Sequence, residues 1–184
     1  MGHSASFQLH KLFVAALVST TTTVEEARAL VEERFGPIDR ELPPVPFTFS
    51  TYYDREMGPG LRRMLLSIGS LVDPSRLADF KEAANEIEQR TARPDGGRTL
   101  NLDPGLLSLS RVILATTKGS AHRIPLRDGF YCEITLIYRH GRYAPLEWTY
   151  PDYQSGAFVE WLGEVRCRYH EQLREIDASR SWRL

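Results

Sequence analysis

The sequence predicts an α+β fold built on a ferredoxin-like βαββαβ core. The run Leu12 to Val18 is apolar on both alternating faces, as in a central strand that is covered on both sides. Two capped helical patterns follow near residues 24–35 and 74–91, and strand-like runs separate them in βαββαβ order. We therefore expect a mixed sheet with this strand in its interior and both helices on one face.

The first helix has clear start and stop signals. Thr22-Thr23 precedes Glu25-Glu26 at capping-box spacing, and Gly36-Pro37 ends the helical pattern. After it, the Pro-rich stretch Leu42 to Pro46 is predicted to be a loop that leads into a strand over 47–53.

A second strand and a second helix follow. The strand is expected over Arg62 to Leu71. Asp73-Pro74 then opens the helix, with Asp as the N-cap and Pro in the first helical position. A short strand over Thr99 to Leu102 completes the core.

Asp103-Pro104 repeats the Asp-Pro pattern that opens the helix at Asp73-Pro74. Leu106, Leu109 and Ile113 fit a helical face, so a further helix is predicted there, although β-branched Val112-Ile113 would also suit a strand.

The last part of the chain reads as a hairpin and a helix. Phe130 to Tyr138 alternates as a strand, His140-Gly141 is a two-residue turn, and the chain returns through Tyr143 to Trp148. The C-terminal helix carries an apolar face from Phe158 to Leu173.

Composition predicts a single cytoplasmic domain over residues 1–184, with residues 1–10 as a frayed terminus. A formal charge of -1 gives no general attraction for nucleic acid. The apolar run at Leu12 to Val18 is too short to cross a membrane. Cys132 and Cys167 form neither a disulfide framework nor a Cys-x-x-Cys metal motif.

Polar residues that the core does not need concentrate between Asn101 and Asp152. Asn101 and Asp103 place an amide and a carboxylate at the start of the predicted helix. They could belong to a site, or Asp103 could cap the helix while Asn101 bonds the backbone.

The segment Thr116 to Arg123 follows that helix and is the strongest candidate for binding an anion. It contains the hydroxyls of Thr116 and Thr117 and the cations Lys118 and Arg123, groups that bind phosphate or carboxylate. The alternative is structural, because a lysine also terminates a helix favourably.

His122 is the candidate acid or base, since the pKa of an imidazole lies near neutral pH. Glu133 lies on the polar face of its strand and could orient His122 or bind Arg123; a surface ion pair would have the same pattern. We expect His122 and Arg123 to approach Glu133 or Asp103 within hydrogen-bonding distance. The alternative is that His122 only anchors its loop.

Two aromatic segments could cover a ligand. Trp148 to Tyr153 places aromatic rings, among them Tyr150, around Asp152, and Tyr52 to Glu56 is similar. Such loops hold a base or sugar ring, or simply close over the edge of a core.

Several chemistries are excluded by their motifs. There is no phosphate-binding Gly-x-x-x-x-Gly-Lys-Ser/Thr loop, no Asn-Lys-x-Asp, no His-x-Thr or His-x-Ser, and no Gly-x-Ser-x-Gly. The histidines at 3, 10, 122, 140 and 170 are too scattered for a metal site, and no cofactor is expected.

A series of short motifs resembles the bacterial and archaeal domain-of-unknown-function family 4416. In order, they are Lys11-Leu12-Phe13-Val14, Phe35-Gly36-Pro37-Ile38-Asp39, Tyr52-Tyr53-Asp54-Arg55-Glu56-Met57-Gly58, Asn101-Leu102-Asp103-Pro104-Gly105, Leu114-Ala115-Thr116-Thr117-Lys118, Ala121-His122-Arg123-Ile124 and Trp148-Thr149-Tyr150-Pro151-Asp152-Tyr153. The resemblance implies a shared site at these segments but no particular reaction. Some members carry a GTP-binding name, which no motif in this sequence supports.

Two functions are therefore carried forward. The first is metal-independent acid/base chemistry on a small anionic or nucleotide ligand, with His122, Glu133 and Asp103 as catalytic groups. The second is a non-catalytic binding or assembly module. Ferredoxin-like sheets pair through a face or an edge, so a homodimer is expected by analogy.

Overall fold

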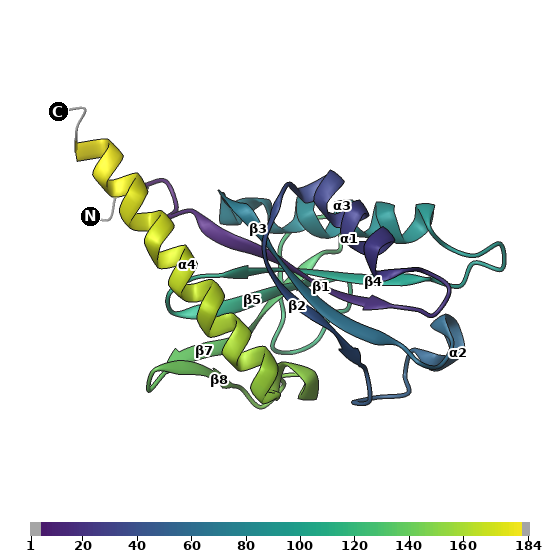
Figure 1. Ribbon diagram of the computed structural model, residues 1–184. Coiled ribbons are helices and arrows are strands. Elements are labelled where there is room, and N and C mark those ends of the chain that lie inside the picture. Colours follow the sequence, from purple (N-terminus) through teal and green to yellow (C-terminus); the bar gives the residue numbers. More distant parts are fainter. Residues whose placement is uncertain (1–4, 182–184) are drawn as a thin grey trace.

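The computed structural model describes residues 5–181, in which four helices and two 3₁₀ turns accompany an eight-stranded antiparallel sheet (Figure 1). The strands are β1 (His10–Val18), β2 (Ile38–Pro46), β3 (Arg62–Val72), β4 (Leu100–Leu107), β5 (Arg111–Thr116), β6 (Ile124–Pro125), β7 (Tyr131–Arg139) and β8 (Arg142–Pro145). The helices are α1 (Val24–Phe35), α2 (Asp54–Met57), α3 (Leu77–Arg90) and α4 (Gly156–Ser181), with 3₁₀ turns η1 (Pro74–Arg76) and η2 (Pro151–Gln154). The predicted α+β class is confirmed.

The sheet is built around β1. Its order is β2-β3-β1-β4-β5-β7-β6. β6 pairs with Tyr131 and Cys132 of β7, and β8 pairs with Leu136 to Arg139 of the same strand. Every residue of β1 is buried, because β3 and β4 flank it and helices cover both faces. The prediction of an interior strand at Leu12 to Val18 is confirmed.

The two faces of the sheet carry separate cores (Figure 1). Val14 and Ala16 of β1 pack in one core with residues of α1 and α3. Phe13 and Ala15 point the other way, into a core that α4 closes with residues such as Trp161. Alternation along one strand thus separates the two layers, and α1 and α3 lie on one face as predicted.

The predicted helix caps are present. Thr23 and Glu26 form the reciprocal capping box, with Glu26 N donating to Thr23 Oγ1 at 3.1 Å. Asp73 accepts from Ser75 N at 2.9 Å, although here the chain first forms η1 and becomes α-helical only at Leu77.

The prediction for residues 42–53 is wrong. Residues Leu42 to Pro46 belong to β2, and residues 47–50 are irregular. β2 tolerates proline because it is an edge strand, paired only with β3, and a register shift lies between Leu42 and Val45.

The helix predicted after Asp103-Pro104 is also wrong. Residues 100–107 and 111–116 form β4 and β5, joined by a turn in which Ser108 Oγ accepts from the amides of Ser110 and Arg111. Asp103 is therefore not a helix cap, and Lys118 follows a strand. The leucine spacing fits both structures; the neighbouring strands β1 and β7 decide the outcome.

The C-terminal hairpin and helix are confirmed, although β8 is shorter and α4 longer than predicted. Arg139 pairs with Arg142 across the His140-Gly141 turn, β8 ends at Pro145, and α4 follows. Of the expected frayed terminus, residues 1–4 lie outside the described range, whereas His10 already belongs to β1. No helix within residues 5–181 has the length and apolar character to cross a membrane.

Candidate functional site

A cavity of about 450 Å³ lies where the sheet opens between β4 and β5. These strands pair only from Gly105 to Leu107, so the first half of β4 has no partner strand on that side within residues 5–181. Side chains from both layers reach this opening, and the connection after β2 and the turn before α4 complete its walls. The volume is that of a small-molecule site.

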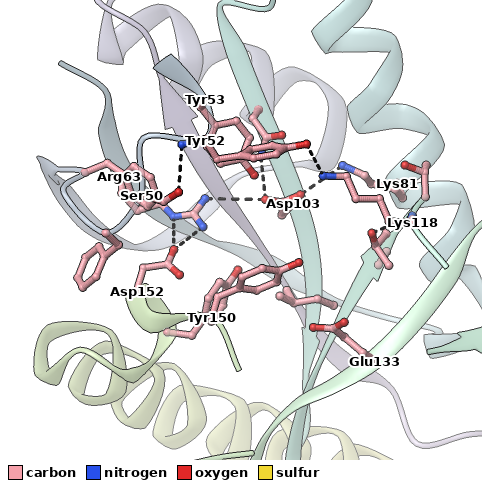
Figure 2. Close-up of a pocket in the computed structure, with 18 of the residues that line it drawn as sticks. Ser50, Tyr52, Tyr53, Arg63, Lys81, Asp103, Lys118, Glu133, Tyr150 and Asp152 are labelled. Carbon is pink, nitrogen blue, oxygen red and sulfur yellow. Dashed lines mark hydrogen bonds and ion pairs between the residues drawn. The ribbon is translucent and has the colours of Figure 1, made fainter. Parts of the chain in front are cut away.

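Arg63 of β3 lines the cavity beside Asp152 (Figure 2). Arg63 donates to Asp152 Oδ2 from Nε at 2.9 Å and from Nη2 at 2.5 Å, and its guanidinium lies 5.7 Å from the ring centres of Phe47 and Tyr153. Burial alone would lower the pKa of Arg63, but Tyr153, Asp152 and Asp103 outweigh it and raise the pKa above its ordinary value. The side chain is a buried, permanent cation.

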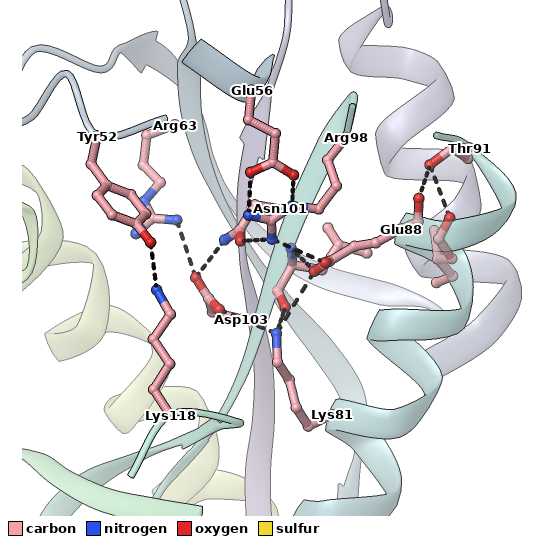
Figure 3. A network of polar contacts seen from close by, with 12 residues as sticks. Tyr52, Glu56, Arg63, Lys81, Glu88, Thr91, Arg98, Asn101, Asp103 and Lys118 are labelled. Atoms are coloured by element: carbon pink, nitrogen blue, oxygen red, sulfur yellow. Dashed lines mark hydrogen bonds and ion pairs between the residues drawn. The ribbon is translucent and has the colours of Figure 1, made fainter. Parts of the chain in front are cut away.

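A network of charged and polar side chains, most of which line the cavity, is shown in Figure 3. Glu56 accepts a two-pronged bond from Arg98 at 2.6 and 2.8 Å, and Arg98 donates to Asn101 Oδ1 at 2.6 Å. Asn101 in turn donates to Asp103 Oδ2 at 2.8 Å. Lys81 of α3 lies 3.4 Å from Asp103 and donates to the carbonyl of Leu102 at 2.7 Å. Asn101 is thus held by Arg98, and Asp103 is held by Asn101 and by Lys81 of α3, rather than by a helix terminus.

Glu133 joins the cavity to the loop after β5. It is 2% exposed, and its Oε2 accepts from Arg123 Nε at 2.7 Å and lies 3.1 Å from His122 Nε2. The predicted approach of His122 and Arg123 to Glu133 is confirmed. His122 stacks on Trp148 at 4.9 Å and lies 3.2 Å from Ser120 Oγ through Nδ1, so its ring is fixed on both sides.

Two cations of the loop hold tyrosines at the mouth of the cavity. Lys118 Nζ donates to Tyr52 Oη at 3.2 Å, and Arg123 Nη2 donates to Tyr150 Oη at 3.0 Å. Tyr52 and Tyr150 remain 65% and 46% exposed, on opposite sides of the cavity (Figure 2). Thr116 Oγ1 accepts from the Lys118 amide at 3.2 Å and so shapes the turn.

Three buried polar atoms of the cavity residues have no hydrogen-bond partner within the described part of the chain. They are Arg63 Nη1, Glu133 Oε1 and Tyr153 Oη. A buried polar atom without a partner costs about 1–3 kcal/mol, so each of these atoms gains most from a bound molecule. A donor and an acceptor without hydrogen-bond partners thus belong to residues that line the cavity.

The structure brings nearly all the candidate residues together. Nine line the cavity: Asn101, Asp103, Thr116, Thr117, Lys118, Arg123, Glu133, Tyr150 and Asp152. His122 does not line it and lies behind Glu133. Trp148, considered as a possible cover for a ligand, stacks on His122 instead.

The sequence interpretation missed four residues of the site, Arg63, Lys81, Glu88 and Arg98. Lys81 and Glu88 lie on the buried face of α3 between apolar residues, and Arg63 interrupts an apolar strand. A charged residue at a core position signals a buried partner, and this signal was present in the sequence. Arg62-Arg63 resembles a solvated basic pair, which hides the buried member.

Within residues 5–181, no group of three or more histidine, cysteine or carboxylate side chains is arranged to hold a metal ion. The carboxylates of the cavity are each paired with a basic side chain. Asp103 and Glu88 contact Lys81, Asp152 contacts Arg63, and Glu133 contacts Arg123.

Comparison with curated proteins and with solved structures finds no match. A family model described as a domain of unknown function (DUF4416) matches residues 8–169. This range holds the sheet, the cavity and the first half of α4. The chain therefore belongs to the DUF4416 family.

Proposed function

We propose that this protein binds a small anionic molecule in the cavity between Tyr52 and Tyr150. The carrying observation is that two buried atoms, Arg63 Nη1 and Glu133 Oε1, have no hydrogen-bond partner within residues 5–181, in residues that line a cavity of about 450 Å³. Arg63 Nη1 lies 3.9 Å from Asp103 Oδ2, beyond hydrogen-bonding distance. Lys118 supports an anionic ligand, because it is the lining cation that has no carboxylate partner within residues 5–181. Its ammonium group is free to bind phosphate or carboxylate.

Calorimetric titration with inorganic phosphate, ribose 5-phosphate and small carboxylic acids tests this proposal. Lys118→Met removes the free cation and is expected to weaken binding of a phosphorylated probe about tenfold, the effect of a lost charge-assisted hydrogen bond. Arg142→Met removes an equal charge from exposed β8 and should leave binding unchanged. Equal weakening in both variants, or no binding by the wild type, would contradict the proposal.

A second candidate function is metal-independent acid/base chemistry on the bound molecule. The observation that favours it is the arrangement of Glu133, whose Oε2 is bonded to His122 and Arg123 while Oε1 has no partner. Glu133 would take a proton from the ligand at Oε1, and His122 would act as a positioning residue behind it. The alternative is simple binding by the same residues.

Exchange of ligand C–H protons in deuterated water separates these functions. Catalysis predicts exchange or conversion of a bound probe that Glu133→Gln abolishes, and a changed pH profile in His122→Gln. A probe that binds but neither exchanges nor converts supports the non-catalytic function. Melting temperatures of both variants show whether a loss reflects unfolding.

We also propose that β1, α1, β2, β3, α3 and β4 form a ferredoxin-like core. The support is their βαββαβ order together with the spatial order β2-β3-β1-β4. A homodimer and a cytoplasmic location remain predictions from the sequence, and light scattering of the purified protein tests the first.

A further inference from the structure

We infer that the ligand of this cavity is a heteroaromatic compound with ring N–H donors and a single anionic group, such as a nucleoside monophosphate. This inference rests on the proposed function and narrows it to one chemical class. Three independent features of the cavity support it.

The first feature is the pair of tyrosines at the mouth. Tyr52 and Tyr150 lie on opposite sides of the cavity (Figure 2), and the hydroxyl of each is held by a cation of the same loop. Phe47, Phe49 and Tyr53 add aromatic surface on the side of Tyr52. Exposed rings whose hydroxyls are already bonded offer a planar ligand their faces at little entropic cost.

The second feature is the polarity of the inner wall. Glu133 Oε1 is an acceptor without a donor, and Arg63 Nη1 is a donor without an acceptor. A simple carboxylate offers only acceptors and can satisfy only the arginine, whereas phosphate adds no donor beyond a P–OH group. A heterocycle that carries N–H groups beside carbonyl or ring-nitrogen acceptors can satisfy both atoms, directly or through one water.

The third feature is the balance of charge. Five basic side chains line the cavity, and four of them have carboxylate partners: Arg63, Lys81, Arg98 and Arg123. Lys118 has none within the described residues and bonds only the Tyr52 hydroxyl. One unpaired ammonium suits one phosphate or carboxylate, whereas a triphosphate needs several free cations.

Isothermal titration with inorganic phosphate, ribose 5-phosphate, the four ribonucleoside monophosphates and their triphosphates tests this inference. At least one monophosphate should bind about tenfold or more tightly than ribose 5-phosphate, since each stacked base contributes that much. Its triphosphate should bind no more than about threefold more tightly, because no second cation without a carboxylate partner lines the cavity within residues 5–181. Tyr150→Leu should remove most of the gain from the base, while Phe7→Leu, an exposed aromatic residue outside the cavity, should not.

The acceptor role of Glu133 is tested on the tightest monophosphate and on its analogue with methylated base nitrogens. Methylation should weaken binding to the wild type about tenfold and have little effect on Glu133→Gln. The wild-type comparison decides the point even if that variant does not fold, and no loss on methylation contradicts the acceptor role.

The remaining outcomes separate this inference from the proposed function. If ribose 5-phosphate binds as tightly as every monophosphate, the proposed function stands and the inference of a heteroaromatic ring is wrong. If a triphosphate binds more than tenfold more tightly than its monophosphate, the inference of a single anionic group is wrong. If no phosphorylated probe binds, a nucleoside monophosphate is ruled out; if the small carboxylic acids fail to bind as well, the proposed function is also wrong.

Discussion

Arg63 is a charged side chain in the middle of an apolar strand, and its partner lies 89 positions further along the chain. Replacing it with Met leaves Asp152 buried, 3% exposed, without its cation. Breaking a buried pair in this way costs about 3–5 kcal/mol, so Arg63→Met should lower the free energy of unfolding by that amount. Urea denaturation measures it.

The matched control is Arg34→Met, which removes an exposed partner of Glu86. Exposed pairs contribute about 1 kcal/mol or less, so the control should change stability little. Similar losses in the two variants would show that Arg63 is not a structural anchor of the cavity.

Tyr53 gives a prediction for alkaline pH. Burial, followed by the nearby Asp103, raises the pKa of Tyr53 to about 12. The unfolded chain then loses the phenolic proton first, so this group stabilises the fold below about pH 10 and that contribution is lost as the pH rises towards 12. The free energy of unfolding of the wild type should therefore fall more steeply across this window than that of Tyr53→Phe. Parallel slopes in urea titrations of the two proteins would contradict this.

At the scale of elements, Gly105 shows why β4 lies against β1. It pairs with Phe13, and a Cβ at this position would overlap the Phe13 ring and lie 2.8 Å from Leu114. Gly105→Ala should therefore destabilise the protein by about 1–3 kcal/mol through overpacking. Gly163→Ala is the control: no atom lies within 4 Å of its Cβ, and alanine in a helix should stabilise by about 0.5–1 kcal/mol. Thermal unfolding should move the two variants in opposite directions.

Elements with local signals were predictable from the sequence. The capping box of α1, the doubly apolar β1 and the His140-Gly141 turn each depend on neighbouring residues alone. The start of β4 was predicted as the short strand Thr99 to Leu102. β2 and the second half of β4 were not predictable in this way, because both contain proline and become strands through partners distant in the sequence. Hydrophobic periodicity and strand propensity predict a strand poorly where pairing with distant strands decides whether it forms.

The candidate site was predictable to a similar degree. The segment from Thr116 to Arg123 and Glu133 carries its polar residues within a short stretch, so their proximity follows from chain length. Arg63 and Lys81 reach the cavity only because the sheet places β3 one strand away from β4, across β1, and because α3 packs on β4. Such long-range placement leaves only an indirect trace in one sequence, a charge at an apolar position.

At the scale of the whole molecule, the cavity is a consequence of the sheet. α3 lies on one face and α4 on the other (Figure 1). Charged groups of the two layers meet at the opening between β4 and β5. Arg63, Asp103 and Lys81 form a charged network at this opening instead of an apolar core. If β5 paired with β4 as far as Leu100, there would be no opening to hold this network.

The central claim is that a small anionic molecule binds in this gap. Amide NMR spectra recorded during titration with ribose 5-phosphate and a nucleoside monophosphate test it most directly. Binding in the cavity predicts saturable shifts at residues 47–53, 101–103 and 116–123, which line the cavity or adjoin it. Shifts confined to the depression near Thr21, Glu26 and Thr91, or spread evenly over the surface, would contradict the account.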